Sequence, residues 1–182
     1  MPRRFHDPEE LFPPATLTRR ALAIIYDGLI SIAVLLVATW VYTMIAGWLT
    51  GWEHYEQMAE AGQLSGDPAL TFVLFLVLYL FFAYFWTRIG QTLGMQVWRI
   101  RIENLDGTSV SWTQALLRYG TAATVIFITM LAGYYVGPVT LLLTIPAIIA
   151  LFLPINGLSV TDRASNSVVV QVPGEAGKKK KL

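Results

Sequence analysis

Four apolar runs, three of them long, constrain this chain more than any other feature of its sequence. They cover about residues 21–48, 69–87, 114–135 and 139–153. A helix of about 20 apolar residues, rising ~1.5 Å per residue, matches the ~30 Å hydrocarbon core of a bilayer. Only 14% of the residues are charged, whereas soluble domains carry about 25%. The sequence therefore predicts an all-α membrane protein, a four-helix transmembrane bundle whose main solvent is lipid.

The fourth run differs from the others because it is short and contains Pro146. Proline removes one backbone hydrogen bond and kinks a helix. Hydropathy is compatible both with a full crossing and with a partly re-entrant segment. Outside the transmembrane domain, predicted at 19–172, we expect a flexible cytoplasmic tail at 1–18 and a basic cytoplasmic tail at 173–182, which holds four lysines.

The segment between the second and third runs has a different pattern. From Val97 to Glu103 apolar and charged side chains mostly alternate, which indicates a strand. An Asp-Gly turn follows, and residues 108–110 are placed to return as a second strand. The sequence predicts a small cytoplasmic β-hairpin cap over 97–110, with 168–172 as a further candidate strand.

Two local signals mark where helices begin. Asp67 precedes Pro68, and aspartate caps a helix whose first position suits proline. Ser111 and Gln114 have the spacing of a capping box, in which each side chain bonds the backbone N–H of the other residue. We therefore expect helices to begin at residues 68 and 112.

The basic residues are distributed unevenly along the chain. Under the four-span arrangement all 13 fall on one side of the membrane, and the two loops on the other side carry none. The positive-inside rule then places both termini in the cytoplasm, as expected for a multi-pass protein of a bacterial inner membrane. A three-span arrangement would place the C-terminal lysines outside. The basic residues are Arg3, Arg4, Arg19, Arg20, Arg88, Arg99, Arg101, Arg118, Arg163 and the lysines at 178–181.

Composition limits the chemistry that this chain can perform. It has no cysteine, which excludes disulfides and thiolate metal sites. Its two histidines, His6 and His54, are far apart and lie outside the apolar runs. The net charge is +1, which gives no basis for a nucleic-acid partner. We expect no catalytic residues, no metal site, no cofactor and no enzyme activity.

Asp27 is the most informative polar residue. It lies about six residues, or ~9 Å, inside the first run, where a carboxylate facing lipid costs on the order of 2–3 kcal/mol. It should therefore face the interior of the bundle. Two interpretations stay open, a structural carboxylate paired with Arg20 or Arg118, and a site that exchanges a proton or cation.

Arg118 is also unusual because it lies at the beginning of the third run. We expect it to pair with Asp27 or with Asp162. Together Arg20, Asp27, Arg118 and Asp162 are predicted to form a functional charged cluster at the cytoplasmic end of the bundle.

Gly90, Thr92 and Gly94 lie in a Gly-x-x-x-Gly motif at the cytoplasmic end of the second span. Glycines at this spacing usually permit a turn or a close approach of two backbones. The motif lacks the Gly-Lys-Ser/Thr ending of a phosphate-binding loop. We therefore interpret it as a structural motif and expect no nucleotide binding.

Taken together, three blocks of this sequence resemble the RDD family of bacterial membrane proteins. Residues 19–27, from Arg-Arg to the aspartate of Ile-Ile-Tyr-Asp, resemble the family's opening block. Residues 90–118 contain Gly-Gln-Thr-Leu-Gly, Val-Trp-Arg-Ile-Arg-Ile and a final Leu-Leu-Arg, and they are similar to its central signature. Residues 161–169, Thr-Asp-Arg-Ala-Ser-Asn-Ser-Val-Val, resemble its closing block.

The chain departs from the family pattern at several positions. Met95 and Gln96 stand where a basic pair is common, and Thr161 stands where a histidine often precedes the closing aspartate. Asn166 and Ser167 replace a common Gly-Thr. A mechanism that needs those histidine or lysine side chains would not transfer to this chain.

The resemblance implies a role in transport of ions or other solutes, which has been proposed for this family. The first hypothesis is transport of a proton, cation or small solute, with Asp27 as the exchanging group. At 182 residues the bundle is small, so transport would require a homo-oligomer. The alternative is a non-catalytic membrane scaffold or assembly partner in which the Arg/Asp cluster is structural.

Overall fold

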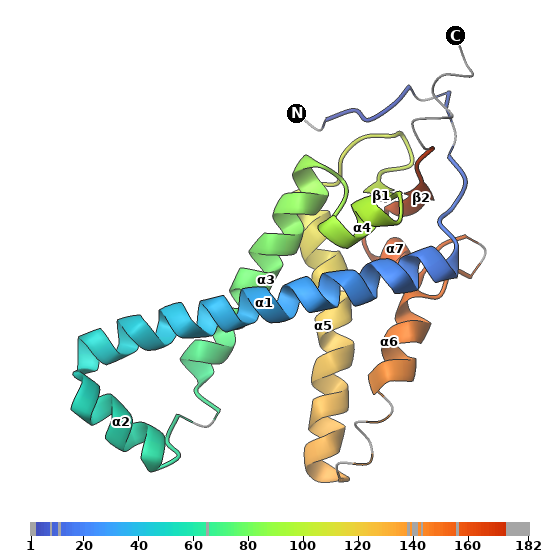
Figure 1. Cartoon of the computed structure of the whole chain (residues 1–182). Helices are drawn as coiled ribbons and strands as arrows, with labels where there is room; N and C mark the ends of the chain where they lie inside the picture. Colours follow the sequence, from blue (N-terminus) through green and yellow to red (C-terminus); the bar gives the residue numbers. More distant parts are fainter. Residues whose placement is uncertain are drawn as a thin grey trace. The chain divides into compact units, whose positions relative to one another are not determined.

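The computed structural model describes residues 3–173 except 8, 11, 65, 138, 140, 141, 143 and 156. Nearly all of the predicted basic tail therefore lies outside the described residues. Within them the chain is mostly helical and has one small antiparallel sheet (Figure 1). In chain order the elements are α1 (Leu17–Thr50), α2 (Trp52–Glu60), α3 (Pro68–Arg88), α4 (Leu93–Val97), β1 (Ile100–Glu103), α5 (Trp112–Tyr135), α6 (Thr144–Phe152), α7 (Val160–Ala164) and β2 (Val168–Gln171).

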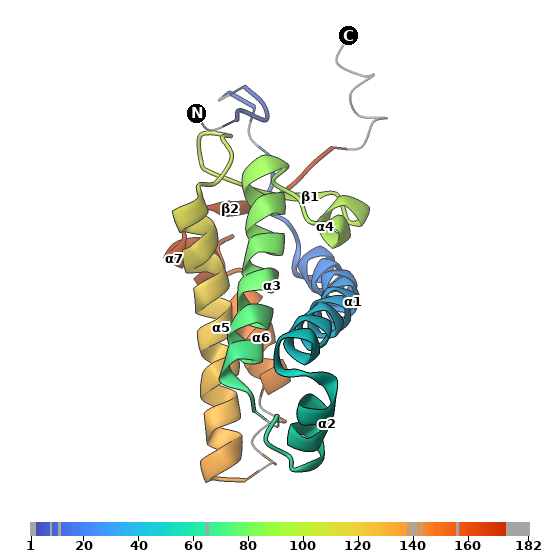
Figure 2. The ribbon, with the colours of Figure 1, turned by 90° about the vertical axis from the view of Figure 1, so that its left-hand side faces the viewer.

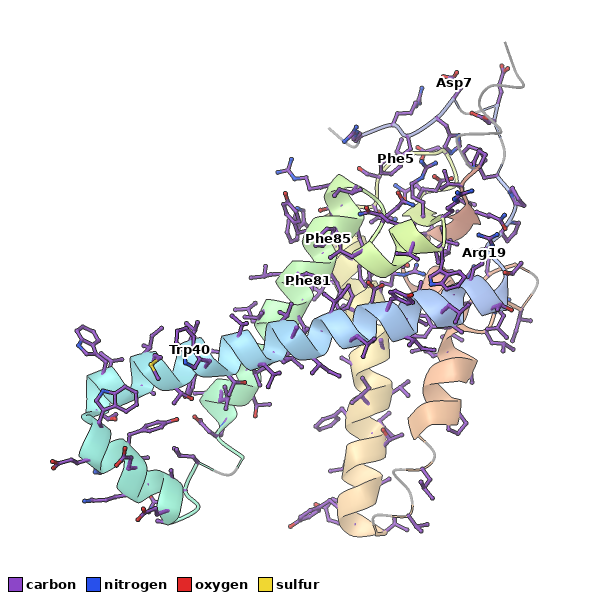
Figure 3. All side chains as sticks on the ribbon, in the orientation of Figure 1. Phe5, Asp7, Arg19, Trp40, Phe81 and Phe85 are labelled. Atoms are coloured by element: carbon purple, nitrogen blue, oxygen red, sulfur yellow. The ribbon has the colours of Figure 1, made fainter. Side chains whose placement is uncertain are left out.

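Three helices in the described part of the chain, α1, α3 and α5, are long and apolar enough to cross a membrane. Their apolar side chains project outward along their length, as Trp40 does in Figure 3. Leu36 on α1 is 67% exposed and Phe127 on α5 is 65% exposed. Soluble proteins rarely expose apolar surface so continuously. The exposed side chains therefore indicate that lipid surrounds these helices.

The predicted four-helix count is not confirmed. Of the fourth run, α6 forms nine residues, which rise only ~13 Å and cannot span a ~30 Å core alone. The beginning of that run, at 139–143, lies mostly outside the described residues. In both views α6 lies alongside α5 (Figures 1 and 2), and α7 also packs against α5.

The chain divides into two compact units, residues 28–81 and the remainder. In the unit formed by residues 28–81, the predicted helix start at Asp67-Pro68 is confirmed. An Asp67 carboxylate oxygen accepts from the backbone N–H of Ala69 at 2.8 Å, and the other accepts from the Tyr42 hydroxyl at 2.6 Å. The hydrogen bond from Tyr42 is the main reason that the pKa of Asp67 is lowered.

In the other unit, residues 3–15, 90–111 and 157–173 meet to form what we call the cap. Its sheet corrects the predicted hairpin. β1 pairs with β2, in a register that places Ile100 opposite Gln171 and Glu103 opposite Val168. Residues 108–110 are therefore not the second strand. Alternation along a chain indicates a strand, but it does not identify the partner with which that strand pairs.

The other parts of the predicted hairpin form local turns. Val97 is the last residue of α4, not the first of a strand. After β1 the carboxylate of Asp106 accepts from the hydroxyl of Thr108 at 2.7 Å and from its backbone N–H at 3.1 Å. The chain then enters α5 through the predicted Ser111–Gln114 capping box, which is confirmed.

The N-terminal segment, predicted to be a flexible tail, is hydrogen-bonded to the cap. The Phe5 N–H donates to the carbonyl of Gly107 at 3.0 Å, and the Ala15 N–H donates to the carbonyl of Val169 at 2.8 Å. The segment covers one face of β1, where the Phe5 ring lies 4.6 Å from the Arg101 guanidinium. This cover explains why β1 is buried on both faces although the sheet has only two strands.

Candidate functional site

Asp162 is held in one orientation by the first turn of α7. The Ser159 hydroxyl accepts from the Asp162 N–H at 3.2 Å, and the Asp162 carboxylate accepts from the Ser159 N–H at 2.9 Å. This reciprocal pair is a capping box, with aspartate in the position that glutamate or glutamine usually takes. The cap of a five-residue helix thereby fixes the direction of a buried carboxylate.

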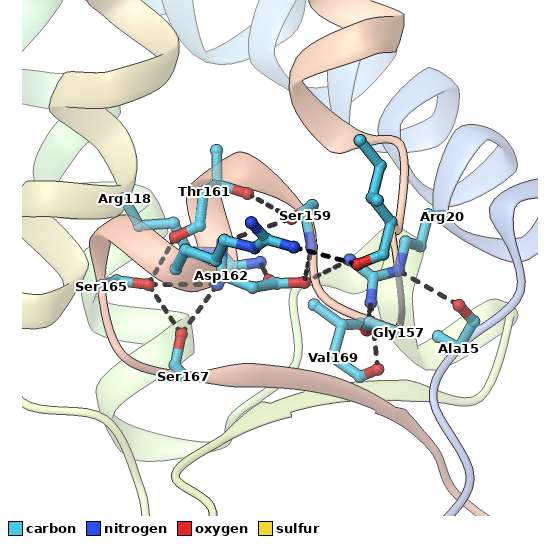
Figure 4. A network of polar contacts seen from close by, with 12 residues as sticks. Ala15, Arg20, Arg118, Gly157, Ser159, Thr161, Asp162, Ser165, Ser167 and Val169 are labelled. Carbon is cyan, nitrogen blue, oxygen red and sulfur yellow. Dashed lines mark hydrogen bonds and ion pairs between the residues drawn. The ribbon is translucent and has the colours of Figure 1, made fainter.

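Two arginines from other helices bind that carboxylate (Figure 4). Arg20 on α1 donates to Oδ2 at 2.6 Å, and Arg118 on α5 donates to Oδ1. The Asp162 side chain has no exposed surface, and the Arg20 and Arg118 side chains are 3% and 4% exposed. We call these three residues the Asp162 network. It joins α1, α5 and α7 within one compact unit.

Other N–H groups of the two guanidinium groups donate to neutral acceptors. Arg20 donates to the carbonyl of Ala15 at 3.2 Å, and Arg118 donates to the hydroxyl of Ser167 at 2.8 Å. Burial alone would raise the pKa of Asp162, but the charges of Arg118 and Arg20 outweigh it and hold the pKa below its ordinary value. Asp162 therefore stays ionised, with both of its oxygens occupied.

Asp27 lies apart from this network and has neutral partners. It is 6% exposed. One of its oxygens accepts from the Gly94 N–H at 2.9 Å, and the other accepts from the Thr92 hydroxyl. No ion pair joins Asp27 to any residue that the structure describes. The carboxyl group therefore sits in a helix long and apolar enough to cross a membrane, and its hydrogen-bond partners in the described part of the chain are neutral.

The Gly90–Gly94 motif allows the backbone of α4 to lie close enough to α1 to donate a hydrogen bond to Asp27. Gly90 has φ +75°, a left-handed conformation that lets the chain turn after α3. At Gly94 an added Cβ would lie 2.5 Å from the carbonyl oxygen of Ala23. Only glycine lets α4 approach α1 so closely. The motif therefore combines both expected roles, a turn at its first glycine and a close backbone contact at its last.

The structure brings together three of the four residues of the predicted cluster. Asp162 is the partner of Arg118, and Asp27 pairs with neither Arg118 nor Arg20. Sequence reasoning missed the role of Ser159, although its spacing to Asp162 is that of a capping box. It also missed Ser167, whose role no local pattern indicates. No group of three or more potential metal ligands occurs among the described residues.

These features define a class, the helical membrane proteins that bury ionisable side chains where their long apolar helices meet a small polar cap. Within that class the chain belongs to the RDD family, whose model matches residues 14–166. The match includes the Asp162 network, Asp27 and the Gly90–Gly94 motif. Comparison with curated proteins and with solved structures finds no match.

Proposed function

We propose that this RDD-family protein moves a proton or small cation across the membrane and that Asp27 is the group that exchanges it. One observation carries the proposal: among the described residues, the buried Asp27 carboxyl group has as hydrogen-bond partners a hydroxyl and a backbone N–H, and no ion pair. Ionisable residues within membrane spans are costly, and they commonly mark ion or proton pathways. A carboxyl group with neutral neighbours can accept a proton or cation without first releasing an arginine.

The contrast with Asp162 supports this assignment. Asp162 is bound by two arginines and by the N–H of Ser159. Its exchange would require breaking buried ion pairs, which costs ~3–5 kcal/mol. We therefore assign the Asp162 network to structure and Asp27 to exchange. Because a bundle of this size encloses little space of its own, we also propose that transport occurs in a homo-oligomer, without cofactor or enzymatic chemistry.

Asp27→Asn is expected to abolish cation-dependent proton flux. The amide keeps the shape and can still accept from Gly94, but it cannot bind a proton reversibly near neutral pH. Neither Arg20 nor Arg118 pairs with Asp27, so the change leaves no arginine unpaired and the variant should accumulate normally. The measurement follows internal pH in inverted membrane vesicles during pulses of Na⁺ or K⁺, with flux falling to that of vesicles without the protein.

The matched control is Asp106→Asn, which neutralises a carboxylate in an exposed turn of the cap. Its flux should equal that of the wild type. Equal flux from wild type and Asp27→Asn vesicles would refute the role of Asp27. Flux no higher than that of empty vesicles in the wild type would refute transport of these ions.

The alternative function is a membrane scaffold, and the Asp162 network favours it. The ion pairs of Arg20 and Arg118 with Asp162 connect three helices, and this structural role requires no chemical reaction. A scaffold would show no flux in any variant, yet Asp162→Asn would still remove the protein from the membrane. Loss of Asp162→Asn from the membrane is expected under both functions, so the flux of the wild type and of Asp27→Asn distinguishes them.

We further propose four crossings of the bacterial inner membrane with both termini in the cytoplasm. Helix α5 has 24 residues, so its ends lie ~36 Å apart. The chain leaves at Tyr135, yet Asp162 bonds Arg118 near the beginning of α5. The intervening residues must therefore return along most of that length. All 13 basic residues then lie on the cap side or in the C-terminal tail, which favours a cytoplasmic cap.

Cysteine labelling tests this orientation cleanly, because the chain has no native cysteine. Glu56→Cys, on α2, should react with a membrane-impermeant maleimide in intact spheroplasts. Leu105→Cys, at a position that is 74% exposed in the cap, should react only after permeabilisation. The reverse pattern would place the cap in the periplasm and refute the proposed topology.

A further inference from the structure

A polar cavity of about 680 Å³ lies within the larger unit, at the cap ends of α3 and α5. Arg88, the last residue of α3, and Trp112, the first of α5, contribute to its wall. Arg3 and Ser109 also line it, from the cap. The cavity is separate from Asp27 and from the Asp162 network, none of whose residues lines it.

The lining of this cavity is basic and unneutralised. Arg3 and Arg88, both exposed, are among its lining residues, and no carboxylate residue is. Among the described residues, neither guanidinium group has a hydrogen-bond or ion-pair partner. By contrast, Arg20 and Arg118 both bind a carboxylate. Two arginines that line one polar cavity with no carboxylate beside them provide the charge and the donors for binding an anion.

The backbone around the cavity is held in place. The N–H of Arg3 donates to the Ser109 hydroxyl at 3.0 Å, and the Ser109 N–H donates to the Arg3 carbonyl at 2.7 Å. On the other side, Gly90 bonds back to Phe85 at 2.9 Å and accepts from Ile102 at 2.7 Å. Both arginines therefore project from anchored backbone, which reduces the entropy lost when they bind a ligand.

The apolar surroundings indicate what kind of anion fits. Trp112 is 46% exposed and Leu116, one turn later on the same face of α5, is 47% exposed. Tryptophan is enriched at the level of lipid headgroups. An apolar strip thus leads from the mouth of the cavity along a membrane-crossing helix, where an acyl chain can lie. A free phosphate ion has no apolar group that could contact that strip.

We propose that this cavity binds the phosphate group of an anionic glycerophospholipid, with Arg3 and Arg88 holding the phosphate and Trp112 and Leu116 contacting an acyl chain. Basic cavities at the cytoplasmic ends of membrane helices are suited to anionic headgroups. The lipid would join the N-terminal segment to α3 and α5 at the membrane surface. This site is independent of the exchange proposed for Asp27.

Native mass spectrometry of the detergent-solubilised full chain, titrated with phosphatidylglycerol or phosphatidylcholine, tests the proposal. The wild type should bind phosphatidylglycerol more tightly than phosphatidylcholine. Arg3→Gln and Arg88→Gln should each weaken phosphatidylglycerol binding about fivefold, and the double variant about 25-fold. Arg88→Lys should retain most of the binding because it keeps the charge.

Arg163→Gln, which removes an exposed arginine of α7, is the matched control and should bind as the wild type does. An equal loss in Arg163→Gln, or unchanged binding in the double variant, would overturn the site. Inorganic phosphate is added as a competitor in a separate arm. If it displaces phosphatidylglycerol at equal concentration, the cavity selects a soluble anion and the lipid assignment fails.

Discussion

Asp162→Asn is expected to destabilise the protein more than any other single conservative change. It leaves Arg20 and Arg118, both nearly inaccessible to solvent, facing each other without an anion. Removing one partner of a buried ion pair costs ~3–5 kcal/mol. At ~2–4 °C per kcal/mol for a chain of this length, the unfolding midpoint should fall by about 6–20 °C. The measurement is thermal unfolding in detergent, together with abundance in the membrane fraction.

Two further variants separate this mechanism from a general effect of the substitution. Asp7→Asn changes an exposed aspartate of the N-terminal segment, and its stability should stay within ~0.5 kcal/mol of the wild type. Replacing Arg20, Asp162 and Arg118 together by methionine, leucine and methionine should recover much of the loss, because no buried charge remains. Wild-type stability in Asp162→Asn would show that the arginines do not need this carboxylate.

Gly94→Ala is the second change with a large expected effect. The added Cβ would lie 2.5 Å from the Ala23 carbonyl oxygen and 2.9 Å from the Asp27 carboxyl group. Since the nearest atom belongs to the backbone of α1, α4 has to move away from α1. Overpacking of this kind costs ~1–3 kcal/mol, which lowers the unfolding midpoint by about 2–12 °C. It should also reduce flux, because Asp27 loses its hydrogen bond from residue 94.

Gly120→Ala is the matched control for this change. Gly120 lies inside α5, and an added Cβ would meet nothing within 4 Å. Alanine is a better helix former than glycine by ~1 kcal/mol. Stability should therefore be unchanged or higher. If Gly94→Ala were as stable and as active as Gly120→Ala, the close approach of α4 to α1 would not matter for the site.

Local patterns predicted the helices where one short stretch contains the whole signal. The Asp67-Pro68 signal and the Ser111–Gln114 capping box each occupy at most four consecutive residues. The structure confirms both helix starts. The length and the lack of charge of the first three runs correctly indicated long apolar helices. The hairpin prediction failed because pairing depends on residues far apart. β1 has its partner 65 or more residues later in the chain, at β2.

For the charged residues too, the sequence predicted the local property but not the partner from a distant segment. The cost of a carboxylate in lipid identified Asp27 as a residue that must be buried, and the structure buries it. The sequence suggested Arg20 or Arg118 as its partner, whereas the structure gives it the Thr92 hydroxyl and the Gly94 N–H. Spacing along one helix predicts which of its residues lie on the same face. It does not predict which residues of another helix contact that face.

The sequence by itself determined that lipid surrounds the long helices and that the few ionisable groups among them must be buried. Those conclusions follow from transfer free energies, which depend on composition along a single segment. Only the tertiary structure decided that Arg20 and Arg118 share Asp162, that Asp27 is bound by neutral donors, and that β1 pairs with β2. Contacts between distant segments follow from how the helices pack, and packing is a property of the whole chain.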